Sequence, residues 1–365
     1  MEKTSVKKRI IAIVIALAVF CGGFWFFQKL LTPKYINDII EGRLIADYYD
    51  HAGGNDVIFI GDCECYENIS PIKMWEEYGI TSYIRGSAQQ LIWQSYYLLE
   101  ETLEYETPKA VVFNVLSMKY NEPQNEAYNR LTLDGMKWSS SKVASIKASM
   151  TEEESFLSYV FPLLRYHSRW SELTGEDWEY MFKGKRSFHQ GYLMRVDVRP
   201  VTSYPSKRPL PDYQFGATAY EYLDKITALC KEKGVELILM KAPSISPVWY
   251  DEWEEQMVEY SQKNQLKYIN FLDLIDEVGI DFNTDTYDNG LHLNLSGAEK
   301  MAVWFGKYLQ EECGIADHRG EPETVAKWQE MTDFYHEMEA DQYRELEEYG
   351  YLKSYGGRPV TEEGK

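Results

Sequence analysis

The sequence lacks the short motifs that mark several common chemistries. It contains no His-Glu-x-x-His pair, no paired Cys-x-x-Cys and no glycine-rich phosphate loop, which excludes the zincin, zinc-ribbon and P-loop classes. Positive charge is also scarce, because 38 Lys and Arg residues stand against 58 Asp and Glu residues and give a net charge of −20. A phosphate backbone would repel such a chain, so we expect no nucleic-acid partner. We likewise expect no metal and no cofactor.

Cysteine is scarce as well. The five cysteines are Cys21, Cys63, Cys65, Cys230 and Cys313, and their odd number and uneven spacing do not describe a disulfide framework. Cys21 lies in an apolar segment, and Cys230 and Cys313 stand singly in stretches with a helical pattern, so we interpret these three as small buried hydrophobes. Only Cys63 and Cys65 remain as candidates for chemistry.

One long apolar run, Ile10–Phe27, contains 18 residues without a charge and follows a segment in which four of the first nine residues are Lys or Arg. At 1.5 Å per residue it would span roughly 27 Å, about the thickness of a hydrocarbon core. A cleaved signal peptide is the alternative, but Phe24–Phe27 is bulky and no Ala-x-Ala site follows. We therefore predict a single-pass anchor in the cell membrane (residues 1–33), with a cytoplasmic N-terminus and an extracellular C-terminal domain. Residues 34–54 are predicted to form a stalk.

Beyond the stalk, strand and helix patterns alternate. Short apolar runs predict strands, and longer amphipathic stretches predict helices. The predicted strands are 57–60, 82–85, 110–115, 235–240 and 267–271, and the predicted helices are 35–50, 71–78, 88–104, 217–233, 248–263 and 295–312. This alternation predicts an α/β fold, a three-layer sandwich with a mostly parallel sheet, over residues 55–313.

Two segments depart from the alternation. Residues 118–212 contain only short helical pieces, around 141–149 and 152–166, and so long an excursion is typical of a lid or a binding insert. Residues 314–365 form a polar, acidic tail in which 321–348 have a helical pattern. That helix either packs on the domain or stays solvated.

The first candidate site residues follow the strand 57–60. Gly61 allows the backbone to turn sharply where the strand ends, so Asp62 and Cys63 are expected at the carboxyl end of the sheet. In open α/β sheets this edge is where ligands bind. Cys63 is therefore well placed for chemistry.

The second candidate stretch surrounds His292. This histidine precedes a predicted helix for which Asn294 or Ser296 is available as the N-cap. Asp285 and Asp288 lie just upstream. Because a catalytic base needs a partner that fixes its tautomer, either carboxylate is a candidate to orient the imidazole.

Gly61-Asp62-Cys63, followed far downstream by Asp288, His292 and Gly297, resembles the first and last blocks of the SGNH/GDSL hydrolase superfamily. The resemblance covers about residues 55–116 and 217–312. It implies a flavodoxin-like α/β/α fold, a nucleophile in the Gly-Asp-Ser turn, and an Asp and a His on one loop near the C-terminus. Gly86 matches the oxyanion glycine of the family. Asn114 matches the oxyanion asparagine, but without its Gly-x-Asn-Asp context.

This sequence departs from the family pattern at two positions. Cys63 stands where the family has Ser. The position three residues before His292 is Asn289, and Asp288 is four before it, so Cys-His-Asp and Cys-His-Asn arrangements both remain open. The N-terminal anchor and the interrupted middle resemble the proteins of lipoteichoic-acid D-alanylation and polysaccharide O-acetylation. That branch implies an acylated envelope carbohydrate or another acylated small molecule as substrate, and a membrane acyltransferase as partner.

The nucleophile hypothesis has competitors. Asp62 and Glu64 flank Cys63, and nearby carboxylates disfavour a thiolate. A degenerate scaffold that binds envelope glycan or an assembly partner is the first alternative, and a redox or metal role of Cys63 with Cys65 is the second. His167 is either a lining residue of the insert's groove or a structural histidine.

Overall fold

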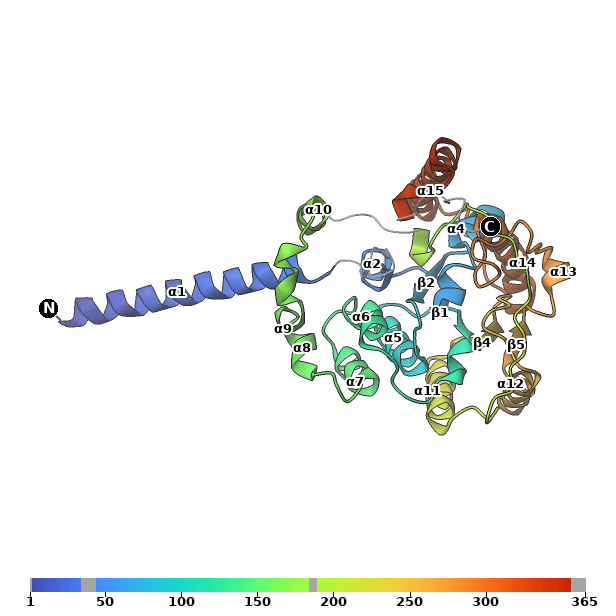
Figure 1. Cartoon of the computed structure of the whole chain (residues 1–365), viewed down its shortest axis with the longest axis horizontal. Coiled ribbons are helices and arrows are strands. Elements are labelled where there is room, and N and C mark those ends of the chain that lie inside the picture. The colour runs from blue at the N-terminus through green and yellow to red at the C-terminus, as the bar shows by residue number, and fades with distance from the viewer. Residues whose placement is uncertain (1, 34–43, 184–188, 356–365) are drawn as a thin grey trace.

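A five-stranded parallel sheet forms the centre of the main domain (Figure 1). The computed structural model describes residues 2–33, 44–183 and 189–355. The strands are β1 (Val57–Gly61), β2 (Ser82–Gly86), β3 (Ala110–Asn114), β4 (Glu236–Lys241) and β5 (Lys267–Asn270), in the spatial order β2-β1-β3-β4-β5. This is the flavodoxin-like, doubly wound order, in which the direction of strand addition across the sheet reverses between β1 and β3. The predicted α/β fold class is confirmed.

The strands are apolar throughout because both faces of the sheet are covered. Along β1, Val57 and Phe59 pack into one core, whereas Ile58 and Ile60 pack into the other. The same alternation continues along β3 and β4. Successive side chains of a strand point to opposite faces, so the two cores lie on either side of the sheet. The result is the predicted three-layer sandwich.

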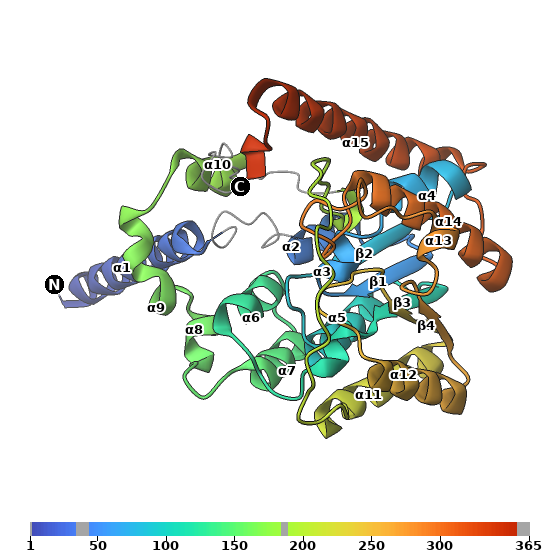
Figure 2. The same ribbon diagram turned by 45° about the vertical axis from the view of Figure 1, so that its right-hand side comes forward.

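Helices of the first core are α4 (Pro71–Tyr78), α13 (Ile275–Val278) and α14 (Leu295–Cys313), and those of the second are α5 (Ile92–Tyr105), α11 (Ala217–Lys233) and α12 (Asp251–Asn264). Figure 2 shows α4 and α14 on one side of the sheet and α11 and α12 on the other. The structure also contains the 3₁₀ turns η2 (Val115–Lys119) and η5 (Lys353–Tyr355).

Most predicted elements are present, with boundaries that differ for local reasons. The helix predicted from residue 88 begins only at Ile92, because Gln89 has a φ of 51° that no right-handed helix accommodates. The strand predicted from Val235 begins at Glu236, since the Val235 N–H caps α11 by donating to Cys230 O. Of the helix predicted over 35–50, the structure describes α2 (Leu44–His51), and residues 34–43 lie outside the described residues.

A buried arginine ties α2 to the sheet. Arg85 on β2 is fully buried, pairs with Glu101 at 3.2 Å, and stacks on the rings of Tyr48 and Tyr49 at 4.0 and 5.3 Å. It also donates to Thr102 at 2.9 Å. Arg85, next to Gly86, therefore contributes to packing within the domain.

The insert contains more helix than its sequence pattern predicts. Its helices are α6 (Glu126–Leu133), α7 (Ser140–Ser149), α8 (Phe156–Val160), α9 (Leu163–Tyr166) and α10 (Gly175–Lys183), with the 3₁₀ turns η3 (His167–Ser171) and η4 (His189–Gly191). The helix predicted over 152–166 is divided because Pro162 forces Phe161 out of helical geometry. A small separate core, which includes Ile45 of α2 and Leu98 of α5, holds α6 to α8 on the domain.

The last part of the insert, residues 189–202, is here called the return segment. Leu193 N donates to Tyr66 O at 2.8 Å, and Arg199 N donates to Thr286 O at 2.9 Å. Leu295 N donates back to Arg195 O at 2.6 Å. The return segment thus runs between the end of β1 and the loop that carries His292. It is the part of the insert that reaches the predicted site.

The acidic tail forms helix α15 (Pro322–Tyr349), which packs on the domain. Trp328 is buried and its ring lies 4.9 Å from that of Trp75 on α4. Tyr335 is also buried, accepts a hydrogen bond from Ser70 Oγ and donates to Glu299, each at 3.0 Å. Of the two arrangements left open by the sequence, the packed one is present.

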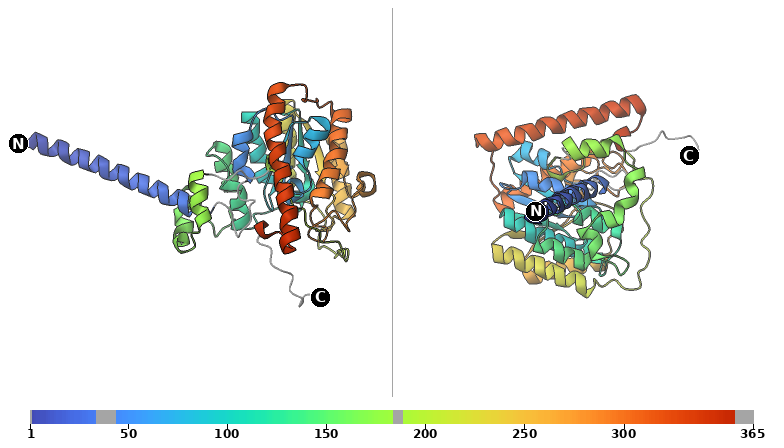
Figure 3. Two further views of the ribbon diagram at one scale, coloured as in Figure 1. Left: turned by 90° about the horizontal axis from the view of Figure 1, so that it is seen from above. Right: turned by 90° about the vertical axis from the view of Figure 1, so that its left-hand side faces the viewer.

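Helix α1 (Glu2–Leu31) projects from the rest of the structure (Figure 3). Within it, Val6–Leu31 is long and apolar enough to cross a membrane, with a mean hydropathy of 2.6. Its most apolar 18-residue window has no buried residue, whereas Leu30 and Leu31 at its end are buried. The predicted span therefore has the length and composition of an anchor.

Candidate active site

Cys63 opens a four-residue helix, α3 (Cys63–Tyr66), directly after β1. Gly61 is required at the turn, because a Cβ there would lie 2.8 Å from both Asn114 Cβ and Cys65 Sγ. Asp62 caps α3 by accepting a hydrogen bond from Glu64 N at 3.1 Å. Cys63 is partly exposed at the carboxyl end of β1, next to the point where the strand order reverses.

His292 is held by Asp288. Asp288 Oδ2 lies 2.6 Å from His292 Nδ1, and Asp288 Oδ1 accepts a hydrogen bond from His292 N at 2.8 Å. Thr286 supports the loop by donating to His292 O at 2.8 Å and accepting from Gly290 N. This pairing fixes a proton on Nδ1 and leaves Nε2 free to act. Nε2 is buried and, within the described residues, has no hydrogen-bond partner.

Glu67 is a site residue that the sequence reasoning missed. Its side chain is 2% exposed, its Oε1 lies 3.7 Å from His292 Nε2, and its Oε2 accepts a hydrogen bond from Tyr287 Oη. Tyr287 Oη is also 3.3 Å from His292 Nδ1. Because Glu67 follows Cys63 by four residues, one helical turn brings both toward His292. That spacing is the signal that could have found it.

The pKa values of three side chains in the site, Cys63, His292 and Glu67, influence one another. Burial raises the pKa of the Cys63 thiol to about 11, although His292 acts to lower it. Burial acts to lower the pKa of His292, but Glu67, Cys63 and the hydrogen bond with Asp288 outweigh it and hold that pKa well above its usual range. Burial also raises the pKa of Glu67, against the influence of His292. The Cys63 thiol is therefore protonated at neutral pH.

A buried ion pair lies beneath α3. Lys241 Nζ, at the end of β4, is 3.0 Å from both carboxylate oxygens of Glu64, and both side chains are fully buried. Lys241 also donates to Ala242 O at 2.7 Å. Because the pair is fully hydrogen-bonded, it can persist without water, and it ties α3 to the sheet.

Asn114, a predicted oxyanion donor, belongs to this buried cluster. Its Nδ2 donates to Asp62 Oδ1 at 2.9 Å and to Glu64 Oε2 at 3.2 Å, so both amide hydrogens are engaged by carboxylates. Gly86, the other predicted oxyanion residue, pairs with Gly61 across β1 and β2. A Cβ at Gly86 would lie 3.0 Å from Gly61 O and from the Tyr66 ring.

Asp285, the other carboxylate predicted to orient His292, instead anchors α14. It accepts hydrogen bonds from Ser296 Oγ at 2.8 Å, Lys300 Nζ at 2.6 Å and Asp281 N at 2.7 Å. The reason is an antiparallel bridge between Thr286 and Leu293, which reverses the chain around Asp288 and leaves Asp285 outside that turn. Although burial acts to raise the pKa of Asp285, these hydrogen bonds hold it below its usual value.

Two predicted lining residues lie away from the imidazole. Asn289 adopts a φ of 66°, and its Oδ1 accepts a hydrogen bond from Thr202 N at 3.0 Å, so the turn directs this side chain to the return segment. His167 lies in η3 of the insert, is exposed, and has Nδ1 3.3 Å from Leu164 O. η3 contacts α1 and α9, and Arg169 joins it to α10. Asn289 is therefore not placed to orient the imidazole, and His167 lies on an exposed turn next to α1 and α9.

Cys65 does not join Cys63. Its side chain is buried in the first core beneath Gly61, and both cysteines are free. Within the described ranges, no three His, Cys, Asp or Glu side chains gather in a way that could hold a metal ion. The paired role considered for these two cysteines has no geometric support.

Asn68 is a second residue that the sequence reasoning missed. Its Oδ1 accepts a hydrogen bond from Leu293 N at 2.8 Å, and its Nδ2 donates to Ser244 Oγ at 3.0 Å. It is fully buried. Asn68 therefore joins the segment after α3 to the His292 loop and to the loop after β4, and fixes where the imidazole stands relative to Cys63.

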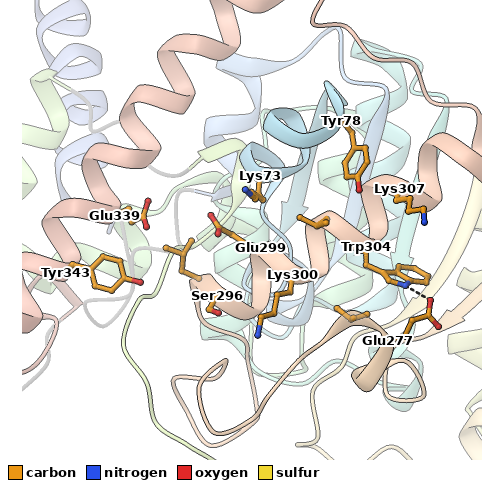
Figure 4. A pocket seen from close by; sticks show the side chains of 13 residues that line it. Lys73, Tyr78, Glu277, Ser296, Glu299, Lys300, Trp304, Lys307, Glu339 and Tyr343 are labelled. Carbon is orange, nitrogen blue, oxygen red and sulfur yellow. Dashed lines mark hydrogen bonds between the residues drawn. The ribbon is translucent and has the colours of Figure 1, made fainter.

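A separate groove of about 630 Å³ lies between α4, α14 and α15 (Figure 4). Its charged side chains are largely paired: Lys300 with Asp285 at 2.6 Å, and Lys73 with Glu77 at 2.7 Å. Trp304 Nε1 donates to Glu277 at 2.7 Å. The groove does not contain Cys63, His292 or Glu67, so we do not assign the reaction to it.

Comparisons with known proteins give a distant likeness. No family model and no curated protein matches the sequence. Among solved structures, a protein of Desulfitobacterium hafniense DCB-2 described as lipolytic and of the G-D-S-L family is 12% identical, with a TM-score of 0.35 over 70% of this chain and 99% of its own. A protein of Bacteroides fragilis NCTC 9343 described as an acylhydrolase is 11% identical (TM-score 0.34; 73% and 95%). A GDSL-like lipase of Bacteroides thetaiotaomicron VPI-5482 is 11% identical (TM-score 0.33; 74% and 98%). At these values the likeness decides no chemistry.

The buried pair beneath α3 gives a testable prediction. Lys241→Met should lower the free energy of unfolding by about 3–5 kcal/mol, because it leaves the Glu64 carboxylate buried without a counter-charge. The double variant Glu64→Gln/Lys241→Met should recover most of that loss. Both are measured by denaturant unfolding of the full chain in detergent. Equal destabilisation of the single and the double variant would contradict the charge-based explanation.

Proposed function

We propose that this chain is a membrane-anchored, SGNH-like esterase or O-acyltransferase with Cys63 as its nucleophile. The observation that carries the proposal is the Asp288–His292 pair beside a partly exposed Cys63 at the strand-order switch point. The substrate we propose is an acylated cell-envelope carbohydrate or another acylated small molecule, with a membrane acyltransferase as partner. Anchoring by α1, with the domain outside the cell, is part of the same proposal.

The reaction proceeds in two acyl-transfer steps. Neutral His292 takes the proton of Cys63 through Nε2 while the sulfur attacks the ester carbonyl carbon, and a tetrahedral oxyanion forms. His292 then gives that proton to the departing alkoxide, and the acyl group remains on Cys63 as a thioester. Water or an acceptor hydroxyl attacks the thioester, His292 removes its proton, and the thiol is regenerated. Asp288 stabilises the imidazolium in both steps.

Backbone donors supply the oxyanion stabilisation. The N–H of Cys63 makes no hydrogen bond to any described residue, as expected at the first position of a helix. Gly86, beside the same turn, supplies the second donor in the proposed site. Asn114 is a positioning residue in this scheme, because both of its amide hydrogens are engaged by Asp62 and Glu64.

A second candidate function is a non-catalytic protein that binds envelope glycan or an assembly partner through the same site. The observations that favour it are the raised pKa of Cys63 and the carboxylate of Glu67 near the Nε2 that a catalytic base must use. Both oppose formation of a thiolate at neutral pH. The two candidates differ in whether Cys63 becomes acylated.

Incubation with p-nitrophenyl acetate separates the two candidates. The full chain in detergent should release p-nitrophenol and carry one acetyl group by intact mass. Cys63→Ala and His292→Ala should abolish both signals, and Cys313→Ala, which changes another partly exposed cysteine, should leave them unchanged. Activity only in Cys63→Ser would mean that the natural cysteine silences an intact scaffold. Absence of any adduct in wild type and Cys63→Ser would favour the binding protein.

The two loop carboxylates are expected to differ in their effect on rate. Asp288→Asn should lower kcat by about 10³–10⁴-fold, because the amide no longer stabilises the imidazolium or fixes its tautomer. Asp285→Asn is the matched control, since it changes the same functional group where it contacts α14 and not His292. It should leave kcat within about threefold of wild type and lower thermal stability. A large kcat loss in Asp285→Asn, with little loss in Asp288→Asn, would assign the orientation of His292 to Asp285 instead of Asp288.

The pH profile tests the role of Glu67. Catalysis needs the neutral imidazole, so kcat/KM should rise with pH through the raised pKa of His292. Glu67→Gln removes a negative charge 3.7 Å from Nε2, which lowers that pKa and moves the rising limb at least about one unit toward lower pH. Tyr287→Phe, which removes no formal charge, should shift it less. If the rising limb of kcat/KM lies at the same pH in Glu67→Gln as in wild type, Glu67 does not raise the pKa of His292.

A further inference from the structure

The outer end of α1 is surrounded by part of the insert. Helices α8 to α10 and η3 lie at the C-terminal end of α1 and run across its direction (Figures 1 and 3). The rings of Phe24 and Phe161 are 5.9 Å apart, and those of Phe26 and Trp178 are 6.3 Å apart. Arg169 donates to Leu31 O at 3.0 Å. The insert is therefore attached to the point at which α1 leaves the apolar span.

Exposed Leu, Phe and Trp side chains are concentrated in this part of the insert. Outside α1, six of the seven exposed Leu, Phe and Trp side chains of the described chain lie between residues 157 and 182. They are Leu157, Phe161, Leu164, Trp170, Trp178 and Phe182, with exposed fractions of 57, 41, 59, 72, 42 and 71%. The seventh is Trp138. Apolar side chains gathered in this way mark a contact surface rather than random exposure.

The orientation of this surface is fixed from the domain side. The guanidinium of Arg130 on α6 bonds Glu126 at 2.8 Å and stacks on the ring of Tyr159 at 4.1 Å. It also donates to Ser158 Oγ at 2.8 Å. On the other side, Arg169 pairs with Asp177 at 2.9 Å and joins η3 to α10. These contacts hold α8 to α10 to the domain and to α1 at once.

We propose that residues 156–182 lie in the lipid–water interface on the outer side of the membrane that α1 crosses, as an interfacial layer. The inference rests on the anchoring by α1 that is part of the proposed function. Short helices that run across a spanning helix and present Trp, Phe and Leu fit the level of the lipid headgroups. The apolar side chains enter the acyl-chain boundary, while Tyr159 of α8 and Arg165 of α9 face the domain.

The occupant is a lipid surface rather than a protein for two reasons. The exposed side chains continue the exposed apolar surface of α1, which includes Trp25 and Phe27 at 61 and 52%. Charge is also not the main force within residues 156–182, because this segment has two arginines against four Asp and Glu residues, and Arg165 is paired with Glu126. Apolar insertion without a polybasic patch needs no anionic lipid.

Photolabelling from within the bilayer tests the interfacial layer. The full chain is reconstituted into phosphatidylcholine vesicles that contain a phospholipid with a diazirine on its acyl chain, and labelled peptides are mapped by mass spectrometry. Label is expected in α1 and in peptides of residues 156–182, and not in α11, α12 or α15. The variant Leu164→Ser/Trp170→Ser/Phe182→Ser should lose the label in 156–182 and keep it in α1. The control Trp138→Ser/Tyr204→Ser/Tyr343→Ser, which changes exposed side chains elsewhere, should keep both.

The outcomes separate this inference from the anchoring on which it depends. Label in α1 but not in 156–182 would overturn the interfacial layer and leave the anchor intact, and would favour a membrane-protein partner for the exposed side chains. Absence of label from α1 as well would overturn the anchor itself. Label in 156–182 that survives the triple Ser variant unchanged would also overturn the assignment to these side chains.

Discussion

The buried Glu64–Lys241 pair is the constraint on which the geometry of the site depends. Glu64 follows Cys63 directly, so fixing its carboxylate against Lys241 at the end of β4 also fixes α3 over the carboxyl edge of the sheet. Asn114 at the end of β3 bonds the same carboxylate and that of Asp62. Three neighbouring strands thereby converge on one turn. Because an unpaired charge in this place would be very costly, the arrangement has little freedom, and Cys63 is presented in one orientation.

The proton balance at His292 is the second constraint. Asp288 supports the imidazole from Nδ1, as a base requires, but Glu67 approaches Nε2, where the base must act. Because the pKa of the Cys63 thiol is raised, the proposed nucleophile would need its proton removed during attack, as a hydroxyl does. With this pKa, little of the Cys63 side chain is present as thiolate at neutral pH.

The parts of this structure that follow from local sequence could be predicted, and the parts that depend on spatial neighbours could not. Short stretches of sequence predict the strands, the turn at Gly61 and the placement of His292 before α14. The choice between Asp285 and Asp288 depends on the Thr286–Leu293 bridge, which residue spacing alone does not show. Glu67 was missed for a different reason: its spacing from Cys63 is informative only if α3 is helical, and α3 is too short to give a helical pattern. Asn68 was missed because its contacts are with residues far along the chain.

The insert connects the two ends of the molecule. Its helical part contacts α1, whereas its return segment bonds the His292 loop through Arg199 and the start of α14 through Arg195. Gln342 of α15 holds the same segment, donating to Met194 O at 3.0 Å and accepting from Val196 N at 3.1 Å. One stretch of chain thus runs from the surface proposed to meet lipid to the edge of the proposed active site.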